Sequence, residues 1–176
     1  DKGCQKVSLE IDRFFAECAG EKKSFQILYQ RLQGKCFGAR RGVIPLFLAK
    51  KLSEIEGTAV IYIGEKELEI TSDNLNHVND FPENYALYLE LETVEKEKYL
   101  KKLEKIFECD TEKFSGQSRF TQIAACMQKW YRSLPQYTMI TLNLPENQSG
   151  SIKKLRNLLR RAEINPRELL FEKIPA

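Results

Sequence analysis

The chain has 176 residues, of which 42% are hydrophobic, and its formal net charge is +3. This size suits one domain of good size or two small ones. Its apolar runs are too short for a membrane span. Its five cysteines are scattered and it has a single histidine, His77, so the sequence supports neither a disulfide framework nor a zinc site.

The first residue and the cysteines indicate the setting of the chain. Because it begins at Asp1 and contains no targeting signal, we interpret it as a piece of a larger protein. Thiols in apolar surroundings, such as Cys18 and Cys126, are typical of a reducing compartment. We therefore expect a cytoplasmic location without membrane attachment.

Three helices are predicted in the first third of the chain. Apolar residues recur at helical spacing over residues 7–18, and Ser8 or a neighbour is the candidate cap of this first helix. Ser24 is predicted to cap a second helix that ends at Gly34. A third helix is predicted to end at Gly57.

The loop between the second and third helices is rich in glycine and positive charge, and its candidate binding residues are Lys35, Gly38, Arg40, Arg41 and Gly42. Glycine allows close backbone approach, and the free N–H groups at a helix start favour an anion such as a phosphate of a nucleic acid or nucleotide. The alternative is structural: the glycines turn one helix into the next, and the arginines pair with the acidic middle of the chain.

The periodicity changes after the third helix. Residues 58–63 and 66–70 are predicted to form a hairpin, followed by a short helix to about Val78 and a strand over residues 85–92. The order of elements in residues 24–92 suggests a small α+β module of winged-helix type.

The second half of the chain is predicted to be mainly helical. One helix carries Tyr99, Leu103, Ile106 and Phe107 along its apolar face. The aromatic set of the next helix, Phe120, Trp130 and Tyr131, is interpreted as core because it has helical spacing. Residues 137–144 fit either a short strand or an extended connector.

A basic helix is predicted to begin at Ser151. Its outward cations are Lys153, Lys154, Arg156, Arg160 and Arg161. Such a stripe can follow a phosphate backbone with little sequence discrimination. A solvated helix face and a docking surface for an acidic partner are equally compatible with the pattern.

These elements predict an α+β fold that is mainly helical. It comprises an N-terminal helix in residues 1–23, a winged-helix-like module in residues 24–92 and a helical module in residues 93–176. We expect no catalytic activity in this piece, because it has one histidine, no distinctive carboxylate pair and no phosphate-binding P-loop motif. No metal or other cofactor is expected.

Several short motifs resemble internal regions of large bacterial P-loop ATPases associated with restriction and phage-defence systems. These motifs lie at residues 37–45, 127–130, 134–135, 165–166, 169–171 and 174–175. The resemblance covers most of the chain in outline and includes no catalytic motif. It implies a non-catalytic accessory segment of a larger DNA-directed protein.

Two functions are therefore expected. The first is binding of DNA through the basic surfaces. The alternative is a protein-interaction or structural module that couples an ATPase core to partner proteins, because residues 65–112 carry 14 acidic and 6 basic side chains between two basic ends. The expected partners are thus DNA, other parts of a larger parent chain and further proteins.

Overall fold

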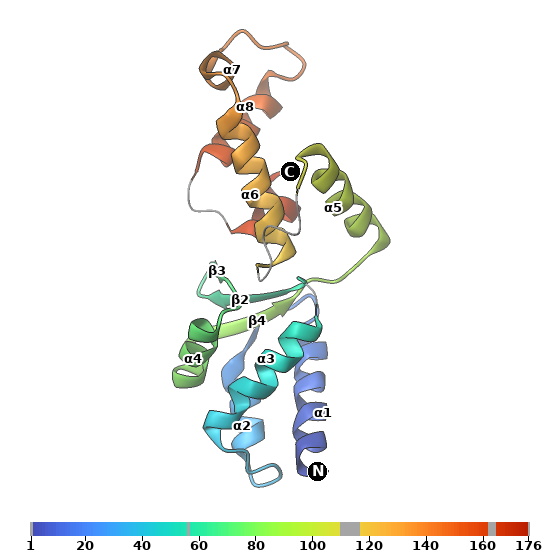
Figure 1. The fold of residues 1–176 in the computed structure, drawn as a ribbon, viewed down its shortest axis with the longest axis vertical. Coiled ribbons are helices and arrows are strands. Elements are labelled where there is room, and N and C mark those ends of the chain that lie inside the picture. Colours follow the sequence, from blue (N-terminus) through green and yellow to red (C-terminus); the bar gives the residue numbers. More distant parts are fainter. Residues whose placement is uncertain (1, 56, 110–116, 162–164, 176) are drawn as a thin grey trace. The chain divides into compact units, whose positions relative to one another are not determined.

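The computed structural model describes residues 2–55, 57–109, 117–161 and 165–175. The chain divides into two compact units, unit 1 (Asp1–Thr93) and unit 2 (Val94–Ala176). The fold is α+β and mainly helical, as the sequence predicts (Figure 1). None of the described helices combines the length and the apolar character needed to cross a membrane.

In its described residues, unit 1 contains four α-helices and a small sheet. Its elements are, in order, α1 (Lys2–Glu17), β1 (Lys23–Ser24), α2 (Phe25–Gln33), the 3-10 turn η1 (Arg41–Val43), α3 (Ile44–Glu54), β2 (Ala59–Ile63), β3 (Lys66–Leu68), α4 (Ser72–Asp80), the 3-10 turn η2 (Pro82–Asn84) and β4 (Tyr85–Leu89). The predicted cap of α2 is confirmed, because Ser24 Oγ accepts a hydrogen bond from the Gln26 N–H at 3.2 Å. Ser8 is not a cap: α1 begins at Lys2, since the polar residues before Val7 extend the helix as an exposed turn.

The sheet is antiparallel throughout and has the strand order β1-β4-β2-β3. The predicted hairpin is confirmed: β2 and β3 pair with Ile63 opposite Lys66, and Gly64 in the turn has a φ of +57°, which favours glycine. The last strand in the sequence, β4, lies between β1 and β2 and pairs Leu87 with Ile61.

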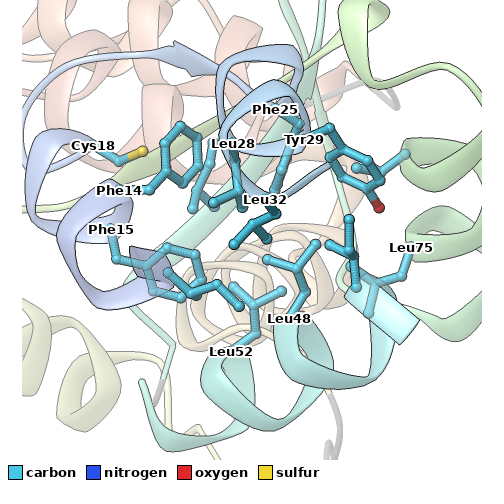
Figure 2. Packing of buried hydrophobic residues seen from close by; sticks show 14 of the residues in the cluster. Phe14, Phe15, Cys18, Phe25, Leu28, Tyr29, Leu32, Leu48, Leu52 and Leu75 are labelled. Carbon is cyan, nitrogen blue, oxygen red and sulfur yellow. The ribbon is translucent and has the colours of Figure 1, made fainter. Parts of the chain in front are cut away.

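The core of unit 1 lies where α1, α2 and α3 meet one face of the sheet, and Figure 2 shows its packing. Phe14 of α1 is fully buried, and its ring centroid lies 6.0 Å from that of Phe25 in α2. Ile61 and Leu87 enter the same cluster from the sheet. The predicted N-terminal segment 1–23 therefore packs in one compact unit with residues 24–92.

Unit 2 is helical in its described residues. Its elements are α5 (Val94–Ile106), α6 (Arg119–Ser133), α7 (Gln136–Ile140), α8 (Ser149–Arg160), α9 (Pro166–Glu168) and the π-helical turn η4 (Leu169–Lys173). The ambiguous segment 137–144 thus begins in a short helix. On α5, Leu100 is buried while the predicted core residue Ile106 is 56% exposed, because α6 contacts a face of α5 that is rotated from the predicted one.

The core prediction for the aromatic set is correct in part. Phe120 and Tyr131 are buried, whereas Trp130 is 40% exposed. The rings of Trp130 and Phe107 meet edge to face with their centroids 5.3 Å apart, and this contact leaves part of Trp130 accessible. Helical spacing predicted that Trp130 is a core residue, and this was wrong because spacing does not determine how much of a side chain its neighbours cover.

Arg119 joins the start of α6 to α5. Its Nη1 donates to Glu97 Oε2 at 2.6 Å, and its Nε donates to Glu104 Oε1 at 2.6 Å. These bonds raise the pKa of Arg119, and the bond from Arg119 is the largest cause of the lowered pKa of Glu97. Because Glu97 and Glu104 lie seven residues apart, about two turns along the same side of α5, one guanidinium holds the helix in two places.

This contact predicts a dependence of stability on pH. The pKa of Glu97 in the folded state lies below its ordinary value of 4.5, so its contribution is complete above pH 4.5 and is lost as the pH falls through the lowered pKa. Trp130 fluorescence reports the melting temperature of unit 2. Below pH 4.5, we expect this melting temperature to fall less steeply with decreasing pH in Arg119→Gln than in the wild type. Arg132→Gln, an exposed change on the same helix, should retain the wild-type slope. Equal slopes for wild type and Arg119→Gln would contradict this role of the contact.

Candidate nucleic-acid interface

The loop of residues 34–42 is held by its own backbone bonds. The Gly38 N–H donates to the Gly34 carbonyl at 2.9 Å, and the Ala39 N–H donates to the Leu32 carbonyl at 2.9 Å. Gly38 has a φ of +55°, in the left-handed region where a β-carbon is unfavourable. The loop is therefore a defined turn between α2 and α3, and its glycine content has a conformational reason at Gly38.

The cations of this loop differ in their surroundings. Lys35 and Arg40 are exposed, as is Gly42. The guanidinium of Arg41 instead donates through Nε to the Asn79 carbonyl and through Nη2 to the Asp80 carbonyl, both at 2.8 Å. These carbonyls end α4, where the helix dipole places partial negative charge, so Arg41 acts as a side-chain cap of that helix. Its predicted role in anion binding stays a prediction.

The N–H groups at the start of α3 are also partly occupied. The Val43 N–H donates to the Arg40 carbonyl at 3.0 Å, and the Ile44 N–H donates to the Arg41 carbonyl through the 3-10 turn that precedes the helix. The next residue, Pro45, has no N–H. This helix start therefore offers an anion fewer donors than the sequence pattern suggests.

The two arginines are accordingly expected to behave differently. Arg41→Gln should lower the free energy of unfolding by about 0.5–1.5 kcal/mol, since it removes hydrogen bonds to the end of α4. Arg40→Gln, an exposed change one residue away, should remain within about 0.5 kcal/mol of the wild type. Urea titration of both variants measures the difference. Equal stabilities would show that the contact of Arg41 with α4 contributes nothing.

The basic helix α8 presents most of its predicted cations to solvent. Lys153, Lys154, Arg160 and Arg161 are exposed, whereas Leu159 is buried on the opposite side. Arg156 is half-buried, and its Nη1 donates to the Thr141 carbonyl at 2.7 Å. Four of the five predicted cations are therefore accessible, and the fifth holds the α7–α8 connection.

Two further cations lie on α6, and the sequence pattern did not single them out. Lys129 and Arg132 are exposed on this helix. Gln128 Nε2 donates to the Arg161 carbonyl at 3.2 Å, so this stretch of α6 lies beside the C-terminal end of α8. The signal was present in the sequence: residues 117–161 contain eight basic residues and one acidic residue, Glu146. An analysis limited to the basic helix misses that this excess of basic residues begins in the preceding helix.

The exposed cations of α6 and α8 are hereafter called the α6–α8 cations; they are Lys129, Arg132, Lys153, Lys154, Arg160 and Arg161. In residues 2–55, 57–109, 117–161 and 165–175, none of them takes part in an ion pair. Ion pairs occur in both units, for example at Arg31 and Lys51 in unit 1 and at Arg119 in unit 2, so the difference between the units lies in their net charge. Unit 1 has 12 basic and 15 acidic side chains, and unit 2 has 16 and 10. The net positive charge of the chain therefore lies on unit 2.

The glycine loop belongs to unit 1 and the α6–α8 cations belong to unit 2, so the sequence-predicted residues form two separate sets. His77 is exposed on α4. Within the described residues, no three histidine, cysteine, aspartate or glutamate side chains are grouped so that they could hold a metal ion.

Comparisons of the chain with protein-family models, with curated proteins and with solved structures found no match.

Proposed function

We propose that this protein binds DNA through the α6–α8 cations. The observation that carries the proposal is the set of six exposed cations, on two packed helices, with no ion pair in the described part of the chain. Accumulated positive charge of this kind attracts a polyanion, because each phosphate neutralised releases condensed counterions. The glycine loop, with Lys35 and Arg40 exposed, is a weaker candidate because Arg41 is bonded to α4.

In this proposal the protein contacts the phosphates of the DNA backbone and does not recognise the bases. Lysine and arginine on exposed helix faces contact phosphates in any sequence, whereas base discrimination needs side chains placed in a groove of the duplex. On the resemblance to ATPases of restriction and phage-defence systems, we propose that the chain is an accessory segment of a larger DNA-directed protein. The β2–β3 hairpin that follows α3 supports relating unit 1 to winged-helix modules, although β4 adds a strand between β1 and β2.

Salt dependence tests the proposed function. Fluorescence anisotropy with a labelled duplex should show binding at 50 mM NaCl that weakens by about a hundredfold or more at 200 mM NaCl. Six phosphate contacts would give a slope of log K against log salt of about −5, and partial engagement would give about −3. Binding that is absent at 50 mM NaCl, or that is insensitive to salt, would exclude this function.

A further inference from the structure

An apolar groove opens on unit 2 between the end of α6, the short helix α7 and α8. Its volume is about 360 Å³, within the range of roughly 300–1,000 Å³ typical of ligand pockets. The main apolar contributors are Trp130, Leu134, Tyr137, Ile152, Leu155 and Leu159. None of these apolar residues belongs to the α6–α8 cations, so the floor of the groove is distinct from the proposed DNA interface, although two of those cations lie on α8 beside it.

The walls of the groove are accessible. Tyr137 is 69% exposed and Trp130 is 40% exposed, although both are large aromatic residues. The nearby Ile140 and Leu142 are also exposed. A collection of apolar side chains on one surface is typical of a protein-binding site rather than of a solvated face.

One side of the groove is basic. Arg156 lines it, and Lys153 and Arg160 lie three residues before and four residues after Arg156, so the three share one side of α8. The acidic residue nearest in the sequence, Glu146, is the one carboxylate in residues 117–161. The groove therefore combines an apolar floor with a positive edge.

We propose that this groove binds an amphipathic helix of a partner protein, with apolar anchors on one face and acidic residues beside them. Apolar side chains at helical spacing would fill the groove, and carboxylates would face Lys153, Arg156 and Arg160. The charge excludes a second copy as the preferred occupant, because two such edges repel each other. Trp130 and Tyr137 could stack with a base, but Leu134, Ile152 and Leu155 form an aliphatic floor, which offers a phosphate no donor and suits the apolar face of a helix better.

The full chain provides its own reporter, because Trp130 is its single tryptophan and lines the groove. The probe is a synthetic peptide of about 15 residues, with leucines at positions i, i+4, i+7 and i+11 and glutamates flanking them. We expect a saturable blue shift of Trp130 emission. A peptide of the same composition with the leucines scattered around the helix, and one with lysine for glutamate, should each bind at least about tenfold more weakly.

Variants separate the groove from the DNA interface. Tyr137→Ala should weaken peptide binding at least about tenfold, and Leu46→Ala, which alters a residue of unit 1 that is 70% exposed, should leave it unchanged. Lys154→Gln combined with Arg161→Gln should weaken DNA binding without changing peptide affinity, because the double variant retains Lys153, Arg156 and Arg160 at the edge of the groove. The proposal is overturned if the peptide with scattered leucines binds as tightly as the amphipathic one. It is also overturned if an oligonucleotide shifts Trp130 emission and the peptide does not, or if the chain dimerises and buries Trp130 without peptide.

Discussion

Phe14→Ala is expected to destabilise unit 1 by about 3–5 kcal/mol, a large part of the stability of a domain of this size. Phe14 has no exposed surface, and its ring packs between those of Phe15 and Phe25. Removing the ring leaves a cavity among α1, α2 and the sheet that the close-packed core can fill only in part. The matched control is Leu9→Ala on the same helix, where Leu9 is 67% exposed and the change should have little effect.

Two optical signals localise the effect of Phe14→Ala. Circular dichroism follows both units, whereas fluorescence follows Trp130 in unit 2. If the two units unfold independently in urea, the variant should shift one part of the circular dichroism transition and leave the fluorescence transition in place. A fluorescence transition that shifts with the variant would show that the units unfold together. A loss well below 3 kcal/mol in the circular dichroism transition would contradict the packing described for Phe14.

Replacing the four exposed cations of α8 with glutamine is expected to reduce duplex DNA affinity at 50 mM NaCl by at least about a hundredfold. These cations are Lys153, Lys154, Arg160 and Arg161. Each phosphate that the protein no longer neutralises lowers the magnitude of the salt slope by about 0.9, so the variant should have a slope smaller by about 3 to 4. Stability should change little, because these side chains are exposed and none is in an ion pair within the described residues.

The control for this variant makes the same change in net charge on unit 1. Lys35, Arg40, Lys50 and Lys66 are exposed, and glutamine at all four positions leaves α8 intact. We expect this control to lower DNA affinity by less than about fivefold, through the long-range field alone. If it instead abolishes binding while the α8 variant retains it, the interface lies at the loop of residues 34–42.

The sequence by itself determined the fold class and most of the helix faces. The three helices predicted in the first third of the chain are present, and each buries an apolar face, with Phe14, Leu28 and Leu48 fully buried, because the 3.6-residue period of apolar residues is visible in the local sequence. The turn at Gly64 was predicted for a similar reason, since a β-branched run before a glycine and an alternating charged and apolar run after it favour a hairpin. The exposed cations of α8 also followed from their position opposite an apolar face.

Tertiary structure alone decided features that depend on residues far apart in the sequence. β4 pairs with β1 across more than 60 residues, and Arg41 reaches carbonyls 38 and 39 residues away, so local periodicity could not predict either contact. Trp130 remains accessible because the ends of α6, α7 and α8 leave a groove there. The sequence determines which faces are apolar or charged, whereas the packing of the helices determines which of those faces remain exposed for a partner.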